Sequence, residues 1–200
     1  IDPVRFIGNY SSGKMGFALA EACAERGAEV TLVAGPVSLK THHPAIKRID
    51  VESAGEMYQA AMTAFPSSDA AILCAAVADY RPENASEQKI KRETEGEMTL
   101  HLVPNPDIAA SLGAIKREGQ VMVGFALETN DEATHAEGKL KRKNLDFIVL
   151  NSLRDQGAGF RCDTNKITII DNAGGVTSYP LKTKREVACD IVNKLVTLLK

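Results

Sequence analysis

The chain has 200 residues, of which 44% are hydrophobic and 25% charged, and its formal net charge is −2. This length is sufficient for a single α/β domain with a substantial core, and the near-neutral charge excludes the overall basic character that binds nucleic acid. Because no apolar run is long enough to cross a membrane and no signal peptide is present, we expect a cytoplasmic protein without nucleic-acid or membrane partners.

The first feature along the chain is a glycine- and serine-rich turn, Gly8-Asn9-Tyr10-Ser11-Ser12-Gly13-Lys14, that leads into a helix. Small residues recur every four positions over 16–24, which predicts one closely packing helix face. Ser11 or Ser12 is expected to cap this helix. Free backbone N–H groups and the positive end of the helix dipole then face an anion, most often phosphate. A helix start without any ligand is the alternative.

The same turn resembles a P-loop but departs from it at one position. Gly8, Gly13 and Lys14 fit G-x-x-x-x-G-K, whereas Met15 stands where Ser or Thr would hold magnesium. No clear hydrophobic strand precedes the turn either. These departures argue against a P-loop NTPase.

Strand and helix patterns alternate through the first half of the chain. Residues 29–34, 46–51 and 70–76 are expected strands, and 70–76 is expected to be the most buried strand of the chain. Ser53 is expected to cap a helix that reaches Phe65. This alternation predicts a Rossmann-like, doubly wound, mostly parallel sheet with helices on both faces. No acidic residue follows the strand at 29–34, which weakens a nicotinamide-binding interpretation.

The second half continues the pattern and ends in an antiparallel element. Asn105-Pro106-Asp107 predicts a helix start with Asn as the cap, and Thr183 and Glu186 form a capping box for the last helix. A C-terminal β-hairpin is expected around the turn at 171–175. The other expected elements are strands at 98–103, 121–125 and 146–150 and a helix at 132–143.

A long polar stretch, 77–96, leaves the end of the strand at 70–76, where open α/β sheets bind ligands. Asp79 can accept hydrogen bonds from a sugar or an amide, or it can simply cap a turn. Lys89 and Lys91 can fold over a phosphate and neutralise its charge. The alternative is that both lysines are solvated, as is usual in polar loops.

Lys139 and Lys143 lie four residues apart and share a helix face, which suits a triphosphate. Spacing alone favours a solvated face instead. Phe125 can pack on a base or on the core. The four cysteines are scattered and are expected to be reduced. No Ser-His-Asp set, metal cluster or close carboxylate pair is visible in the sequence.

Taken together, these segments resemble the phosphopantothenoylcysteine synthetases of coenzyme A biosynthesis, particularly the bacterial type fused behind a flavin-dependent decarboxylase. The resemblance spans most of the chain in the family's order, so it is more specific than any single motif. The matching stretches are residues 2–7, 9–16, 75–80, 89–91, 105–108, 124–126 and 139–146.

The resemblance implies a single synthetase domain, 1–200, that acts as a CTP-dependent ligase. It joins 4′-phosphopantothenate to L-cysteine through an acyl-cytidylate, and it releases pyrophosphate and CMP. Asn9 would serve the second half-reaction and Lys89 the first. By this resemblance the nucleotide is surrounded by Leu73, Cys74, Ala75, Asp79, Lys89, Asn105, Pro106, Asp107, Ile108, Phe125, Lys139 and Lys143. Ser11, Ser12, Gly13 and Lys14 form the phosphate-facing turn.

The resemblance also implies partners and cofactors. Mg²⁺ would arrive with the CTP triphosphate, and no FMN is expected in this chain because the decarboxylase part is absent from it. A homodimer is expected, with the hairpin at 166–181 as a plausible interface arm. The family normally has a further strand before Asp2-Pro3, and this sequence starts after it.

Two further interpretations stay open. One is a non-catalytic nucleotide-binding or assembly domain, which pyrophosphate release would exclude. The other is a nicotinamide oxidoreductase, which failure to bind NAD(P)H would exclude. The residues alone do not choose between CTP and ATP.

Overall fold

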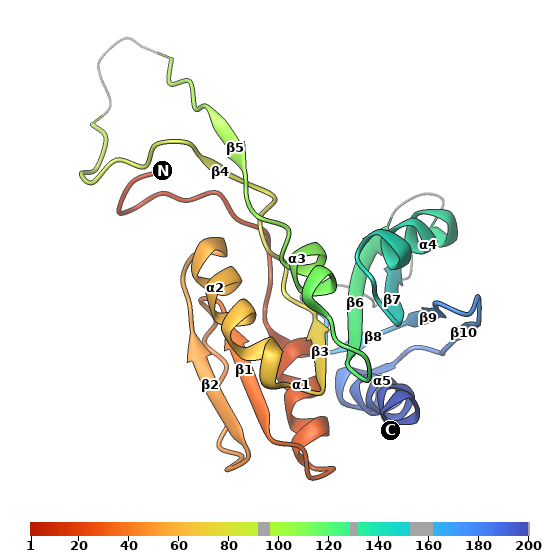
Figure 1. Ribbon diagram of the computed structural model, residues 1–200. Helices are drawn as coiled ribbons and strands as arrows, with labels where there is room; N and C mark the ends of the chain where they lie inside the picture. The colour runs from red at the N-terminus through yellow and green to blue at the C-terminus, as the bar shows by residue number, and fades with distance from the viewer. Residues whose placement is uncertain (92–96, 129–131, 153–161, 200) are drawn as a thin grey trace.

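The computed structural model describes residues 1–91, 97–128, 132–152 and 162–199. Its main sheet has five strands in the order β10-β9-β7-β6-β3 (Figure 1). The strands are β3 (Ala70–Leu73), β6 (Val121–Glu128), β7 (Phe147–Ser152), β9 (Ile167–Asp171) and β10 (Val176–Ser178). β3, β6 and β7 run parallel, and β9 and β10 are antiparallel additions.

Helices cover both faces of this sheet, as the alternating sequence pattern predicts. They are α1 (Lys14–Ala24), α2 (Ala54–Ala64), α3 (Ile108–Ile115), α4 (Glu132–Arg142) and α5 (Lys184–Leu198). Alternate residues of the central strands point to opposite faces. Val123 and Phe147 pack with α1 and α5, whereas Met122 and Ile148 pack with α3 and α4.

β1 (Val30–Ala34) and β2 (Ile46–Asp50) pair with each other in parallel and form a separate two-stranded sheet. Within the described residues, no strand pairing joins this pair to the main sheet. β3 is therefore an edge strand, and all four of its residues are only partly buried. The expectation that 70–76 is the most buried strand is thus wrong, because apolar composition does not distinguish an edge strand from a central one.

Residues 1–12 and the two-stranded ribbon of β4 (Tyr80–Pro82) and β5 (Leu102–Pro104) form an arm that projects from the body (Figure 1). The predicted strand at 98–103 is shorter and shifted in the structure, because only 102–104 face a partner strand. Residues 92–96 of the long polar stretch lie outside the described residues. Two small elements complete the chain: η1 (Phe65–Ser67) and the pair of β8 (Thr164–Asn165) with β11 (Lys182–Thr183).

The start of α1 differs from the sequence prediction. No side chain caps this helix, and the cap position is Gly13 rather than Ser11 or Ser12. Gly13 has a φ of 74°, a conformation that glycine adopts without strain. The Ser11 hydroxyl accepts a hydrogen bond from the Gly13 N–H at 3.3 Å, so it stabilises the turn before the helix rather than the helix itself.

The other predicted helix starts are mostly confirmed. Ser53 caps α2 by accepting from the Glu56 N–H, and Thr183 forms the predicted capping box with Glu186. The cap of α3 is Asp107, which accepts from the Ala110 N–H, so the prediction of Asn105 as the cap is wrong. The hairpin of β9 and β10 is confirmed, and the four cysteines are free thiols.

Candidate functional site

The segment that leaves β3 forms the floor of the candidate site. Leu73 pairs in register with Gly124, so Leu73, Cys74 and Ala75 end beside Phe125 on the neighbouring strand. Phe125 is partly buried, and its ring packs against the core with a part left exposed. Burial raises the pKa of Cys74 to about 12. Cys74 is therefore a neutral thiol at physiological pH and contributes shape rather than a nucleophile.

Asn105 ties the loop after β3 to the start of α3. Its side-chain amide donates to the Ala78 carbonyl at 2.8 Å, and its backbone N–H donates to the Asp79 carbonyl, also at 2.8 Å. Pro106, Asp107 and Ile108 follow at once and open α3. These bonds bring 73–79 and 105–108, two of the predicted nucleotide-contacting segments, together at one edge of the sheet.

A lysine and a carboxylate meet at the N-terminus of α3. Lys143 Nζ lies 2.9 Å from Asp107 Oδ2. Partial burial opposes ionisation of Asp107, but the Ala110 N–H and the Lys143 ammonium prevail and lower its pKa. Lys139 lies one turn earlier, on α4, and is partly buried. Lys143 therefore reaches the edge where 105–108 lies.

Asn9 joins the N-terminal turn to this edge. Its side-chain amide donates to the Val77 carbonyl at 3.0 Å. Val77 lies between Ala75 and Asp79, so the turn containing Ser11, Ser12, Gly13 and Lys14 adjoins the segment that leaves β3. These two segments are far apart in the sequence, and the Asn9 contact brings them side by side.

Two lysines, Lys14 and Lys184, contribute positive charge beside the N-terminal turn. The sequence analysis identified Lys14 as part of that turn but did not identify Lys184. Lys14 Nζ lies 2.5 Å from Asp163 Oδ1. Lys184, at the start of α5, is buried, and its pKa is lowered first by that burial and then by repulsion from Lys14. Two ammonium groups therefore lie near the N-termini of two helices, an arrangement that favours an anion. No sequence pattern indicated Lys184, because its ammonium is held by the Cys162 carbonyl of a separate segment.

Lys89 is not brought to the other predicted residues. It is exposed, and its side chain makes no hydrogen bond or ion pair among the described residues. Residues 83–91, the described part of the chain that carries it, lie on the arm, away from α4 (Figure 1). For Lys89 to act on a nucleotide beside Lys143, the arm segment must approach that edge.

Comparison with known proteins gives a family match over almost the whole chain. The family described as DNA/pantothenate metabolism flavoprotein C-terminal domain matches residues 1–199. The chain belongs to this family.

Individual relatives match the chain over its whole length. The chain is 59% identical over 199 residues to a Cysteine/Cysteine sulfinic acid decarboxylase from an unknown prokaryotic organism, covering 100% of this chain and 55% of that protein. It is 48% identical to the Coenzyme A biosynthesis bifunctional protein CoaBC of Vibrio parahaemolyticus, covering 100% of this chain and 50% of that protein. It thus spans about half the length of these relatives.

The fold is shared with a solved relative. The crystal structure of the C-terminal domain of Coenzyme A biosynthesis bifunctional protein CoaBC has a TM-score of 0.82 and 39% identity, covering 99% of this chain and 90% of that chain. The Rossmann-like architecture expected from the sequence is therefore confirmed.

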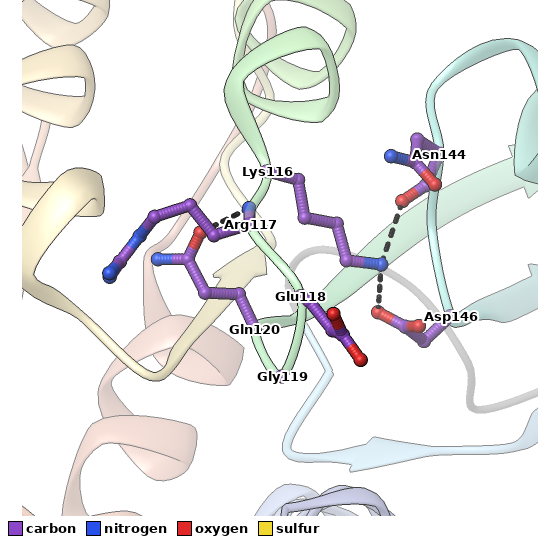
Figure 2. Close-up of a pocket in the computed structure, with 7 residues that line it drawn as sticks. All are labelled: Lys116, Arg117, Glu118, Gly119, Gln120, Asn144 and Asp146. Atoms are coloured by element: carbon purple, nitrogen blue, oxygen red, sulfur yellow. Dashed lines mark hydrogen bonds and ion pairs between the residues drawn. The ribbon is translucent and has the colours of Figure 1, made fainter.

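One cavity lies at the opposite end of the sheet from the candidate site. It has a volume of about 310 Å³ and is lined by Lys116, Arg117, Glu118, Gly119, Gln120, Asn144 and Asp146 (Figure 2). Lys116 Nζ binds Asp146 Oδ2 at 2.6 Å, and the same oxygen accepts from the Met122 N–H at 2.6 Å. These bonds connect the segments just before β6 and β7 and stabilise the starts of both strands. We therefore assign the residues that line this cavity a structural role rather than a catalytic one.

Potential metal ligands do not cluster in the described residues. Within 1–91, 97–128, 132–152 and 162–199, no group of three or more His, Cys, Asp or Glu side chains could hold a metal ion. In the part of the chain that the structure describes, no helix has both the length and the apolar character that a membrane span needs.

Proposed function

We propose that the chain is the ligase domain that joins 4′-phosphopantothenate to L-cysteine with CTP, as part of coenzyme A biosynthesis. The observation that carries the proposal is the convergence of four segments at one sheet edge, joined by three side-chain contacts. Asn9 contacts Val77, Asn105 contacts Ala78, and Lys143 contacts Asp107. Family membership and the CoaBC names of the relatives support the same activity.

The first proposed step is activation of the carboxylate. A carboxylate oxygen of 4′-phosphopantothenate attacks the α-phosphorus of CTP, and the bond from that phosphorus to the bridging oxygen breaks. Pyrophosphate leaves and an acyl-cytidylate remains. Such a step needs positioning and charge neutralisation rather than a protein nucleophile. Lys89, Lys139 and Lys143 would neutralise the triphosphate, and the backbone of 73–75 and 105–108 would position the nucleotide.

The second proposed step forms the amide. The cysteine amine attacks the acyl carbon, the bond from that carbon to the phosphate oxygen breaks, and CMP leaves with release of a proton. Asn9 would act here, because an amide can donate and accept hydrogen bonds but cannot serve as a strong base. The turn of Ser11, Ser12, Gly13 and Lys14 would hold the phosphate of 4′-phosphopantothenate, where Lys14 and Lys184 add positive charge.

Mg²⁺ is proposed as the ion that accompanies the triphosphate. Magnesium sites of this kind use few protein oxygens and several phosphate and water oxygens. A site without a cluster of three potential ligands in the described residues fits that mode. When bound, the ion would offset the negative charge of the triphosphate.

We also propose a homodimer and a covalent link to a flavin-dependent decarboxylase, with FMN bound outside this chain. The relatives named bifunctional are about twice as long as the matched region. Exposed apolar side chains mark candidate interfaces. Val176 on β10 is 63% exposed, but Phe6 and Tyr10 on the arm are 83% and 79% exposed. The arm is therefore a stronger interface candidate than the hairpin at 166–181.

The name of one relative, Cysteine/Cysteine sulfinic acid decarboxylase, suggests a second candidate. The matched region is 55% of that protein, so the activity in its name does not identify the part that performs it. Among the described residues, the thiols with an altered pKa are Cys23 and Cys74, and burial raises the pKa of both rather than activating either. The ligase is better supported by the site geometry.

The proposal predicts turnover that depends on CTP. Pyrophosphate should appear when CTP and 4′-phosphopantothenate are both present, and at least about tenfold more slowly with ATP, a difference of about 1.4 kcal/mol in transition-state binding. A coupled pyrophosphate assay on the purified protein measures both rates. Equal rates with ATP would reject the nucleotide choice. No release with either nucleotide would favour the non-catalytic domain.

Asn9→Asp should separate the two half-reactions. The new carboxylate keeps the size of the side chain but loses the N–H that donates to the Val77 carbonyl, and it adds negative charge near phosphate. We expect pyrophosphate release to continue in part while the acyl-cytidylate accumulates in the presence of cysteine. Mass spectrometry of the quenched reaction detects the intermediate. Normal amide formation without accumulation of the acyl-cytidylate would show that Asn9 stabilises the turn and has no role in the second half-reaction.

A further inference from the structure

Asp2 is the centre of a hydrogen-bonded clamp on the arm. Its Oδ1 accepts from the Val4 N–H at 2.9 Å and the Arg5 N–H at 2.8 Å. Its Oδ2 accepts from Arg5 Nε at 2.9 Å and from the Ile90 N–H at 3.2 Å. Although the arm projects into solvent, the Asp2 side chain has 0% exposed surface, because its own turn and the Ile90 segment cover it.

Arg5 completes the clamp from the other side. Its guanidinium pairs with Asp2 Oδ2 and also donates to the Ile90 carbonyl at 2.9 Å. Both polar groups of the Ile90 backbone are thus held by one ion pair. The Ser86 N–H donates to the Ile1 carbonyl at 2.9 Å, so residues 1–5 hold the segment at two points.

The segment held in this way carries the predicted activating lysine. Ile90 lies between Lys89 and Lys91, and the Lys89 side chain itself makes no hydrogen bond or ion pair among the described residues. Its placement therefore depends on how the backbone beside it is held. Ordering a long loop before a ligand arrives removes part of the entropic cost of using a group on that loop.

We propose that Asp2 is a positioning residue for Lys89, acting through the Arg5 pair and the Ile90 backbone. This inference rests on the proposed ligase function. The hydrogen bonds from Arg5 hold the pKa of Asp2 well below its usual range, so the carboxylate stays charged at any pH where the enzyme is assayed. The clamp is therefore a permanent feature and not a pH switch.

The test compares Asp2→Asn, Lys89→Gln and the double variant. The introduced asparagine keeps the size of the side chain but places an NH₂ donor where Arg5 and Ile90 also donate. We expect the kcat of CTP-dependent pyrophosphate release to fall on the order of tenfold in Asp2→Asn, with a smaller change in the KM for CTP. Because Asp2 acts through Lys89, adding Asp2→Asn to Lys89→Gln should cause no further fall in the kcat of pyrophosphate release.

Two controls separate positioning from general damage. Glu83→Gln alters an exposed carboxylate on the same arm that contacts His101 at 3.0 Å and does not touch 89–91, so it should retain wild-type rates. Asp2→Glu keeps the negative charge, so it should retain most of the kcat that Asp2→Asn loses. A readout independent of turnover is amide exchange at Ile90 by NMR, which should accelerate in Asp2→Asn and not in Glu83→Gln.

The outcomes are distinguishable. If the unaltered protein releases no pyrophosphate, the proposed function fails and the positioning role of Asp2 in that reaction fails with it. If the unaltered protein is active, three results each overturn the inference alone. These are a normal kcat in Asp2→Asn, a loss that persists in the Lys89→Gln background, and unchanged exchange at Ile90.

Discussion

Replacing Lys89 with glutamine is expected to slow pyrophosphate release on the order of 10²-fold, the loss typical of removing one charge-stabilising donor from a transition state. The fold should be unaffected, because Lys89 is exposed and its replacement by glutamine removes little buried surface. A single-turnover pyrophosphate assay measures the rate, and thermal unfolding measures the stability of the same sample.

Lys91→Gln is the matched control, since Lys91 is exposed on the same segment two residues away. It should lower the rate far less than Lys89→Gln. A folded Lys89→Gln variant that releases pyrophosphate at the wild-type rate would show that Lys89 is a solvated lysine of a polar loop. Equal losses in the two variants would instead indicate a general effect of charge on the arm.

Gly113→Ala is expected to destabilise the protein by about 3 kcal/mol, at the upper end of the range for overpacking a core. A Cβ added at Gly113 would lie 2.2 Å from the Lys143 carbonyl oxygen and 2.8 Å from its carbon, and these are backbone atoms that cannot move alone. The Asn144 side chain also donates to the Gly113 carbonyl at 3.0 Å. Helix α3 and the end of α4 would have to separate, and the Lys143–Asp107 pair would be displaced with them.

Urea unfolding should show a lower midpoint for Gly113→Ala with an unchanged m-value, and CTP affinity should fall because Lys143 moves. Gly138→Ala is the matched control on α4. Apart from its chain neighbours and the backbone of its own helix, no atom of the described residues lies within 4 Å of a Cβ added there, so the substitution should stabilise the helix by up to about 1 kcal/mol. Wild-type stability in Gly113→Ala would contradict the close approach of α3 to the Lys143 backbone just after α4.

The parts of the fold that could be predicted from the sequence are those governed by local pattern. The residues of 121–125 and 146–150 predicted the strands β6 and β7, and Ser53 and Thr183 each predicted a helix start. Asn105 was the wrong cap because two capping residues stand close together. The structure uses Asp107 for the helix and Asn105 for the Ala78 carbonyl.

The parts that could not be predicted depend on contacts between distant segments. The edge position of β3 follows from strand pairing rather than from its own apolar residues. Lys184 is buried, and its ammonium donates to the Cys162 carbonyl, which belongs to a separate segment of the chain. The clamp of Asp2 on Ile90 joins segments from opposite ends of the first half of the chain and left no signal in either. Family resemblance, rather than residue spacing, identified Lys143 as a candidate site residue.

The central claim is that the carboxylate of 4′-phosphopantothenate attacks the α-phosphorus of CTP. The most direct measurement supplies 4′-phosphopantothenate with a heavy-oxygen label in its carboxylate, together with CTP and cysteine, and records the mass of the CMP formed. The account predicts that one labelled oxygen is transferred to CMP, since the acyl-cytidylate breaks between its acyl carbon and that oxygen. Amide formation with unlabelled CMP, or with CDP and phosphate as the products of CTP, would contradict it.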